Sequence, residues 1–268
     1  MDVKKSYSEG TILTGLSEPG LGRIILNRPE KRNALTDALW RAIPDAIDWL
    51  VTGQNVRVIV IEGAGGRDFS AGADIGEFDT LRKDATSARS YEAGNAMAFA
   101  AIRNAPVPVL AAIRGICFGG GFGLAAAADL RIADETARFA VPAARLGLAY
   151  PVDAMIDLVR ALGDQQARHA LYTGKEFSAE HAKLSGCLLS LCAPDALDRE
   201  ATELARALAK TAPLSVRASK AAIAAQASGT EDDWRNAKTL ADATFESRDY
   251  AEGRAAFRDR RAPDFTGL

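Results

Sequence analysis

The sequence predicts an α/β protein that begins with alternating strands and helices and ends with helices only. Two runs rich in β-branched residues, 22–26 (GRIIL) and 56–62 (VRVIVIE), read as strands separated by a longer helical pattern. Strands that alternate with helices pair in parallel, which indicates an α/β core. We expect this core to span residues 1–194 and a helical region to span residues 195–268.

The remaining elements of the core follow in order. Residues 36–51 (TDALWRAIPDAIDWLV) have the spacing of an amphipathic helix, with Thr36 as its N-cap, because a short hydroxyl side chain can accept a hydrogen bond from the first turn. Residues 107–113 (VPVLAAI) and 130–133 (LRIA) continue the series of strands.

The last part of the chain shows three helical patterns with no strand between them. They cover residues 197–210, 214–226 and 231–257. A helical region of this length could form a separate bundle or fold against a neighbouring subunit.

Composition and charge exclude several classes of protein. The 268 residues carry a formal net charge of −2, so nothing indicates a general nucleic-acid or anionic-membrane binder. No segment approaches the roughly 20 apolar residues that span a bilayer, and the first ten residues do not resemble a signal peptide, so we expect a cytoplasmic protein. Cys117, Cys187 and Cys192 share no metal-type spacing with the two histidines, so we interpret them as reduced thiols and expect no metal site.

Two loops made of small residues each follow a predicted strand. Residues 67–75 read RDFSAGADI, and residues 115–129 read GICFGGGFGLAAAAD, in which three glycines precede an alanine-rich helix. Small residues leave backbone N–H groups accessible, and a helix N-terminus favours negative charge. Two such loops that each aim one N–H at a single point would form an oxyanion hole. Either loop alone is also explained by a tight turn or by close packing of helix on sheet.

The two loops resemble those of the enoyl-CoA hydratase/isomerase (crotonase) superfamily. The resemblance extends to ILNRPEKRNALTDAL near the N-terminus and to ARFAVPAARLGLAYP, in the same order and spacing, from about residue 22 to residue 265. It implies a spiral of ββα units with a C-terminal helical region used in trimerisation. It also implies a homotrimer or a dimer of trimers.

The resemblance implies an acyl-CoA site. The thioester oxygen would accept hydrogen bonds from the backbone N–H groups of Ala73 and Gly120, and coenzyme A would be part of the substrate, with no tightly bound cofactor. Coenzyme A would also be contacted by a set of residues of which the last two reach the nucleotide of a neighbouring subunit: Arg32, Asn33, Ala34, Ala71, Asp74, Ile75, Phe257 and Arg260.

The residues that would carry out the reaction depart from the family pattern. Hydratases of the superfamily use two glutamates to activate water, and this chain has Gly123 and Ala143 at those positions. Neither residue can take up a proton, so the two-glutamate mechanism is not expected. Pro151 occupies the position where some isomerases carry an aspartate. Asp153 is the nearest carboxylate, and it is a candidate catalytic base or, alternatively, the N-cap of the following helix.

The segment 77–91 lines the pocket in relatives, but its Arg82, Lys83 and Tyr91 do not match a known catalytic spacing. We therefore expect them on a solvated helical face. His169 and His181 are expected at the surface or as satisfied core residues.

Three functions remain open. The first is an enzyme that enolises or adds to an acyl-CoA with Asp153 or another base. The second is an acyl-CoA hydrolase or decarboxylase that depends mainly on the oxyanion hole. The third is a non-catalytic acyl-CoA binding protein. No nucleic-acid or membrane partner is expected in any of them.

Overall fold

The computed structural model of this protein describes residues 2–268, and its core is a seven-stranded sheet with the order β1-β2-β3-β4-β5-β7-β10. A second sheet has the order β6-β8-β9. The strands are β1 (Asp2–Tyr7), β2 (Ile12–Glu18), β3 (Leu21–Leu26), β4 (Val58–Gly63), β5 (Val109–Ile113), β6 (Ile116–Phe118), β7 (Leu130–Asp134), β8 (Arg138–Ala140), β9 (Phe177–Ser178) and β10 (Ser190–Cys192).

The four predicted strands are confirmed as β3, β4, β5 and β7, and they pair in parallel in that order. The sequence reading missed the antiparallel β1 and β2, which extend the sheet beyond β3. It also missed the short strands of the second sheet.

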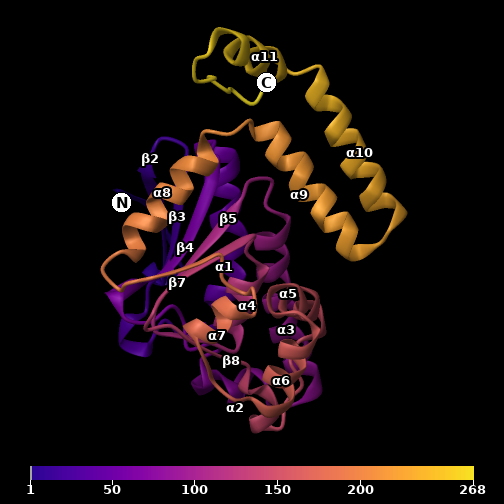
Figure 1. Cartoon of the computed structure of the whole chain (residues 1–268). Helices are drawn as coiled ribbons and strands as arrows, with labels where there is room; N and C mark the ends of the chain where they lie inside the picture. The colour runs from indigo at the N-terminus through magenta and orange to yellow at the C-terminus, as the bar shows by residue number, and fades with distance from the viewer. Residues whose placement is uncertain (1) are drawn as a thin grey trace.

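The first seven helices lie between strands along the chain, and the other four follow β10 (Figure 1). They are α1 (Asp37–Asp48), α2 (Phe78–Leu81), α3 (Ala85–Asn104), α4 (Gly120–Ala127), α5 (Met155–Leu162), α6 (Asp164–Thr173), α7 (Ala179–Leu184), α8 (Leu197–Ala209), α9 (Pro213–Ser228), α10 (Glu231–Phe245) and α11 (Arg248–Asp259). The N-cap of α1 is Thr36, as predicted, and its hydroxyl accepts a hydrogen bond from the Leu39 N–H at 3.2 Å.

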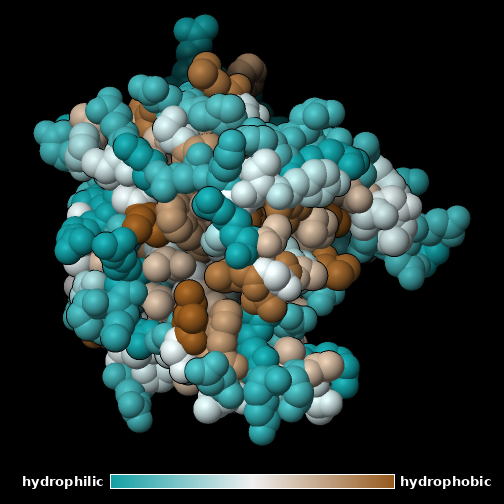
Figure 2. Space-filling view, turned by 90° about the horizontal axis from the view of Figure 1, so that it is seen from below, coloured by the Kyte–Doolittle hydropathy of each residue, from teal (hydrophilic) through white to brown (hydrophobic). Residues whose placement is uncertain are grey.

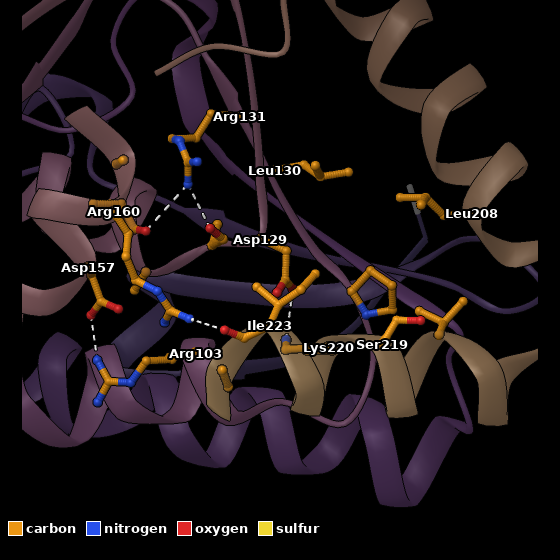
Figure 3. A pocket seen from close by; sticks show the side chains of 17 residues that line it. Arg103, Asp129, Leu130, Arg131, Asp157, Arg160, Leu208, Ser219, Lys220 and Ile223 are labelled. Atoms are coloured by element: carbon orange, nitrogen blue, oxygen red, sulfur yellow. Dashed lines mark hydrogen bonds and ion pairs between the residues drawn. The ribbon is translucent and has the colours of Figure 1, made fainter. Parts of the chain in front are cut away.

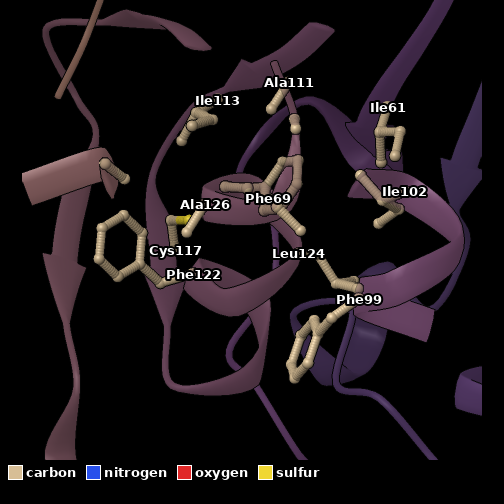
Figure 4. Packing of buried hydrophobic residues seen from close by; sticks show 14 of the residues in the cluster. Ile61, Phe69, Phe99, Ile102, Ala111, Ile113, Cys117, Phe122, Leu124 and Ala126 are labelled. Atoms are coloured by element: carbon tan, nitrogen blue, oxygen red, sulfur yellow. The ribbon is translucent and has the colours of Figure 1, made fainter. Parts of the chain in front are cut away.

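Helix α4 lies in the middle of the hydrophobic core. All its residues from Gly121 to Ala127 are buried. In Figure 4, Phe122 and Leu124 leave the helix in different directions, and Phe99 of α3 packs nearby. A helix that is apolar on every side must be enclosed on every side, so its N-terminus is held in a fixed position.

The C-terminal region consists of a part that covers the sheet and a part that leaves it. Helix α8 packs against β4, β5 and β7 in a second hydrophobic cluster, whereas α9, α10 and α11 extend outward as an arm (Figure 1). The predicted helix 231–257 is two helices, because the Ser247 hydroxyl accepts a hydrogen bond from the Tyr250 N–H and caps a new start. Across residues 2–268, no helix combines the length and the hydrophobicity needed to cross a bilayer.

Candidate active site

The loop at residues 70–73 is held between two other segments. On one side the Ser70 N–H donates to the Ile116 carbonyl at 2.9 Å, which ties the loop to β6. On the other side the Leu35 N–H donates to the Gly72 carbonyl at 2.8 Å. Because β6 leads directly into α4, this clamp fixes the loop relative to the glycines at the start of that helix.

The three consecutive glycines are required for two different reasons. Gly119 has φ +49°, in the left-handed region that favours glycine. A Cβ on Gly120 would lie 2.6 Å from the Trp40 ring, and a Cβ on Gly121 would lie 2.7 Å from Ser70. The first glycine permits the turn into α4, and the other two permit close approach of neighbouring segments.

The backbone N–H groups of Ala73 and Gly120 are neighbours, as the resemblance implies. A Cβ built on Gly120 would lie 3.7 Å from the Ala73 nitrogen, and one built on Gly72 would lie 3.2 Å from the Gly120 nitrogen. Neither N–H has an acceptor among residues 2–268. The Gly120 nitrogen also lies at the positive end of α4. The hydrogen bonds that hold the loop therefore place two backbone N–H groups side by side, each without an acceptor among residues 2–268.

These donors face a mostly apolar pocket of about 120 Å³. Its walls come from Trp40, Ala71, Gly72, Ala73, Ile75, Phe78, Arg82, Asn95, Phe99, Gly119, Gly120, Pro142, Ala143, Leu146, Leu148, Ala149, Tyr150 and Pro151. Figure 2 views the molecule from the end that carries α2, and hydrophobic side chains gather near the middle of this face within a hydrophilic surround. Within residues 2–268, the lining has no aspartate or glutamate, and its only ionisable side chains are Arg82 and Tyr150.

The place where the resemblance would put the first glutamate is already filled. A Cβ on Gly123 would lie 2.6 Å from the Tyr150 hydroxyl oxygen and 2.7 Å from the Phe99 ring. Ala143, at the second position, lines the pocket with a methyl group. The two aromatic side chains thus occupy the space next to Gly123, and no carboxylate fits there without displacing them.

Tyr150 was not singled out by sequence reasoning, yet it contacts the oxyanion loop directly. Its hydroxyl donates to the Gly119 carbonyl at 3.2 Å, and the Gly123 N–H donates to the same oxygen at 3.0 Å. That carbonyl and the Gly120 N–H belong to one peptide group, so these bonds fix the direction of the free donor. Burial raises the pKa of Tyr150 well above its usual value, which keeps the hydroxyl protonated. In the sequence, only the glycine at position 123 indicated that another side chain fills this space.

Asp153 lies in a single turn of 3₁₀ helix, Val152–Ala154, with its side chain exposed. It is not among the residues that line the pocket. It also accepts no capping hydrogen bond, since the residue before α5 is Ala154 and that helix start has no side-chain cap. The alternative of a helix cap is therefore wrong, and the role of Asp153 as a base stays a prediction.

Two of the predicted coenzyme A contacts have their side chains occupied elsewhere. Asn33 is 1% exposed, and its amide nitrogen donates to the Asp68 carbonyl at 2.8 Å. Burial would raise the pKa of Asp74, but hydrogen bonds from Arg28 at 2.9 Å and from the Gly76 N–H lower it below its usual value. Both side chains hold the loops in place, so any ligand contact would come from their backbone.

The other predicted contacts on these loops lie beside the pocket. Ala71 and Ile75 are part of its lining, and Ile75 is 65% exposed. Arg32 is exposed, and its carbonyl accepts the Ala71 N–H at 2.9 Å. Ala34 is half-buried in the same turn. Ile75 is therefore accessible at the pocket, and Arg32 is exposed on the turn that is bonded to the neighbouring Ala71.

Phe257 and Arg260 lie in and directly after α11, far from the pocket of their own chain. Figure 1 shows α11 and α2 at opposite ends of the molecule. Phe257 is 89% exposed. These residues cannot complete their own pocket in this conformation, and their contact with a neighbouring subunit stays a prediction.

The expectation of a solvated face for Arg82 and Tyr91 is wrong. Tyr91 is 2% exposed and accepts a hydrogen bond from the Trp40 indole at 3.1 Å, and burial raises its pKa to about 12. Arg82 follows the last residue of α2 and folds back over the Phe78 and Tyr91 rings. Only Lys83 is exposed, as predicted. The helical periodicity breaks between α2 and α3, so it could not be read through this segment.

The two histidines are placed as expected. His169 and His181 are exposed, and Cys117 is fully buried in the core. Burial raises the pKa of the Cys117 thiol well above its usual range, so it is no nucleophile at neutral pH.

A larger cavity of about 380 Å³ lies between the core and α9 (Figure 3). Its charged side chains are already bonded within the chain. Arg103 pairs with Asp157 at 2.5 Å, and Lys220 pairs with Asp129 at 2.7 Å. Arg131 donates to the Ala128 carbonyl at 2.7 Å, at the end of α4. The ion pair between Lys220 of α9 and Asp129 connects the arm to the core across this cavity.

Comparison with known proteins points to one family. Residues 17–268 match the family model described as enoyl-CoA hydratase/isomerase. The chain is 33% identical over 252 residues to the crotonyl-CoA hydratase of Syntrophomonas wolfei, a match that covers 92% of this chain and 95% of that one.

Solved structures that resemble this chain belong to the same family by their titles. An enoyl-CoA hydratase/isomerase family protein from Hyphomonas neptunium is 38% identical, with a TM-score of 0.90 and coverage of 96% of this chain and 98% of that one. The enoyl-CoA hydratase of Bacillus anthracis is 29% identical, with a TM-score of 0.89 and coverage of 96% and 100%.

Proposed function

The chain belongs to the enoyl-CoA hydratase/isomerase family, and we propose that it is an enzyme that stabilises an enolate or oxyanion of an acyl-CoA thioester between the N–H groups of Ala73 and Gly120. The observation that carries this proposal is the pair of neighbouring free donors at the head of the small pocket. Donors that are already in place stabilise charge that develops on the thioester oxygen more than they stabilise the uncharged substrate.

In this proposal the first step is recognition of the thioester. The pantetheine passes the mouth of the pocket near Ile75, and the carbonyl oxygen reaches the two N–H groups. The hydroxyl of Tyr150 and the Gly123 N–H both bond to the Gly119 carbonyl, which polarises the peptide whose N–H binds the substrate.

The two-glutamate mechanism of hydration is not part of the proposal. With Gly123 and Ala143 at the implied positions and no carboxylate in the described lining, no group in the pocket can hold and deprotonate a water as those glutamates do. Asp153 would need its loop to move before it could act as a base, because it is exposed outside the lining.

A second candidate follows from the same lack of carboxylates. A decarboxylation or a thioester hydrolysis can depend on the oxyanion hole without a carboxylate base in the pocket. In a decarboxylation, the bond between the α-carbon and the carboxyl carbon breaks, carbon dioxide leaves, and the electron pair enters an enolate held by Ala73 and Gly120. A proton from water then completes the product.

The test is a set of thioesters followed for separate bond changes. Crotonyl-CoA reports hydration, butyryl-CoA in heavy water reports exchange of the α-hydrogens, and malonyl-CoA reports release of carbon dioxide. A thiol reagent reports free coenzyme A in every sample.

We expect at least one of these reactions, and we expect crotonyl-CoA hydration to be slow, since each missing acid–base group typically contributes about 10²–10⁴ in rate. Rapid hydration would contradict the exclusion of that mechanism. Tight binding of every thioester with no reaction would contradict the enzyme proposal. An Asp153→Asn variant with unchanged turnover would remove that residue as a base.

A further inference from the structure

A partly buried ion pair, Arg28 with Asp74, lies next to the loop at residues 70–73, and neither side chain lines the small pocket. Arg28 follows β3, and its side chain is 16% exposed, while Asp74 directly follows Ala73. One nitrogen of the guanidinium, Nη1, donates to the Asp74 carboxylate at 2.9 Å and to the Ala34 carbonyl at 2.7 Å. The arginine therefore joins two backbone segments that are distant in the sequence.

The bond to Ala34 is the first in a row of hydrogen bonds. The Ala34 carbonyl belongs to the peptide group that carries the Leu35 N–H, and this N–H donates to the Gly72 carbonyl at 2.8 Å. The Gly72 carbonyl in turn belongs to the peptide group that carries the Ala73 N–H. The row thus runs from the Arg28 guanidinium through two peptide groups to the first donor of the proposed oxyanion hole.

The two segments in this row are held together by further bonds. The Asp74 N–H donates to the Leu35 carbonyl at 2.9 Å, and Leu35 and Ala73 are partners in a parallel bridge. Leu35 is fully buried, so water does not compete for its bonds. The Asp74 carboxylate also accepts from the Gly76 N–H at 3.0 Å. The direction of the Ala73 N–H therefore depends on where Arg28 holds the partner segment.

The charge of Arg28 acts at the far end of the row. A hydrogen bond from an ionised donor is roughly twice as strong as one between neutral groups. Each bond in such a chain also polarises the next, by about 10–30% per bond. The polarised Ala34 carbonyl makes the Leu35 N–H a stronger donor, and the Gly72 carbonyl passes the effect to the Ala73 N–H. An oxyanion at Ala73 would then face a row of aligned dipoles that ends in a cation.

We propose that Arg28 is a positioning residue of the oxyanion hole, which orients and polarises the peptide group of the Ala73 N–H without touching the substrate. Tyr150 acts in the same way at the second donor, because its hydroxyl bonds to the carbonyl of the peptide group that carries the Gly120 N–H. Tyr150 does so directly, whereas Arg28 acts through one intervening peptide group. This inference rests on the proposed function, because it needs a thioester oxygen bound at Ala73 and Gly120.

The test observes the thioester carbonyl by difference infrared spectroscopy. The probe is butyryl-CoA with carbon-13 at the thioester carbonyl, measured free and bound at saturation. Hydrogen bonds that polarise a carbonyl weaken its double bond, so binding in the oxyanion hole lowers the stretching frequency. We expect the frequency in Arg28→Met to return part of the way to the free value. On whichever thioester is turned over, kcat should fall about tenfold without a matching rise in KM, less than the about 10²–10³ that follows loss of a donor.

Arg23→Met is the matched control. Arg23, on β3, has a side chain that is 11% exposed, and it bonds to Glu62 at 2.9 Å and to Thr202 at 2.8 Å. Its loss removes an ion pair of similar burial that has no bond to the loop at residues 70–73. Both variants should lower the Tm, but only Arg28→Met should change the carbonyl frequency. Arg28→Lys keeps a positive charge without the planar guanidinium, so it should give an intermediate frequency.

The outcomes separate the two proposals. The wild-type frequency in Arg28→Met overturns the role of Arg28 and leaves the oxyanion hole intact. An equal change in Arg23→Met also overturns it, because loss of stability would then explain the change. A wild-type complex whose carbonyl keeps the free frequency overturns the proposed function itself. If Arg28→Met does not fold, Arg28→Lys is compared with Arg23→Lys, and the wild-type frequency in both overturns the role of Arg28.

Discussion

Two hollows of the molecule, the cavity under α9 and the pocket at the start of α4, differ in whether the charged side chains or backbone N–H groups that line them already have partners. The cavity under α9 is the larger and contains more charge, but Arg103, Lys220 and Arg131 are each bonded to a carboxylate or a carbonyl of the chain (Figure 3). The pocket at α4 is smaller and nearly uncharged, yet its N–H groups at Ala73 and Gly120 have no acceptor in the described part of the chain. Unused hydrogen-bonding capacity, more than size or charge, marks the hollow that is suited to a ligand.

The comparison also separates two uses of buried polar groups. In the cavity they connect elements, since the ion pair between Lys220 and Asp129 joins α9 to the segment that precedes β7. In the pocket they face a space that a substrate can fill. Substitutions should therefore affect stability at the first site and turnover at the second.

The largest effect is expected from Gly120→Ala in the pocket. The new Cβ would lie 2.6 Å from the Trp40 ring, so the backbone must shift and the Gly120 N–H would no longer point at the thioester oxygen. Loss of one oxyanion donor typically costs about 10²–10³ in kcat, or roughly 2.7–4 kcal/mol. Steady-state kinetics on whichever thioester is turned over measures it. Gly53→Ala, where the added carbon meets Trp49 at an ordinary 3.4 Å, is the matched control. Turnover that survives in Gly120→Ala would remove the oxyanion hole from the mechanism.

The next effect concerns the cavity and should appear in stability alone. Lys220→Met leaves the Asp129 carboxylate with only the Val109 N–H, at 2.7 Å. The Asp129 carboxylate is partly exposed, but the mostly buried Lys220 ammonium also donates to the Val107 carbonyl at 3.1 Å, and loss of hydrogen bonds from a charged group costs about 1.5–3 kcal/mol. We expect unfolding in denaturant to shift by this amount, with kcat per folded molecule unchanged. Lys238→Met, at an exposed position of α10, is the control. A fall in kcat as large as that of Gly120→Ala would show that the two hollows do not have separate roles.

A smaller effect on turnover is expected from Tyr150→Phe. The variant keeps the ring next to Gly123 and removes the hydroxyl that bonds to the Gly119 carbonyl. A hydrogen bond of this kind contributes about 0.5–1.5 kcal/mol, which corresponds to a roughly 2- to 13-fold loss. We expect the loss in kcat rather than in thioester affinity, because the bond orients a donor whose contribution grows in the transition state. Tyr172→Phe, 71% exposed, is the control. A loss confined to KM would contradict this positioning role.

The sequence predicted the strands and helices around the site better than the side chains that line the pocket. The parallel strands and the Thr36 cap depend on local patterns, and these were confirmed. The neighbouring positions of Ala73 and Gly120 followed from the family resemblance, because two loops far apart in the chain cannot be placed together from spacing alone.

The contents of the pocket depend on contacts between distant residues. Tyr150 fills the space next to Gly123 from 27 residues away, and no local pattern connects the two. Arg82 and Tyr91 looked like a polar helical face, but the chain bends between α2 and α3 and turns them inward. The side chain of Asn33 is buried and donates to the Asp68 carbonyl, a contact between distant residues that no local pattern indicates, and its predicted contact with coenzyme A stays a prediction.

The smallest predicted effect is a pH dependence of stability that arises in the cavity. Burial raises the pKa of Asp157 above its usual 3.8, although the paired Arg103 acts in the opposite direction. The folded state therefore binds more protons than the unfolded state between pH 3.8 and the folded pKa, and the contribution of Asp157 to stability decreases as pH rises through that range. Asp157→Asn does not titrate, so the Tm of the wild type minus that of the variant should fall from about pH 3.5 to pH 6. Asp195→Asn, at an exposed position, should show no such trend. A difference that rises with pH instead would mean that the ion pair with Arg103 outweighs burial, and that this cavity stabilises the charged carboxylate more strongly than water does.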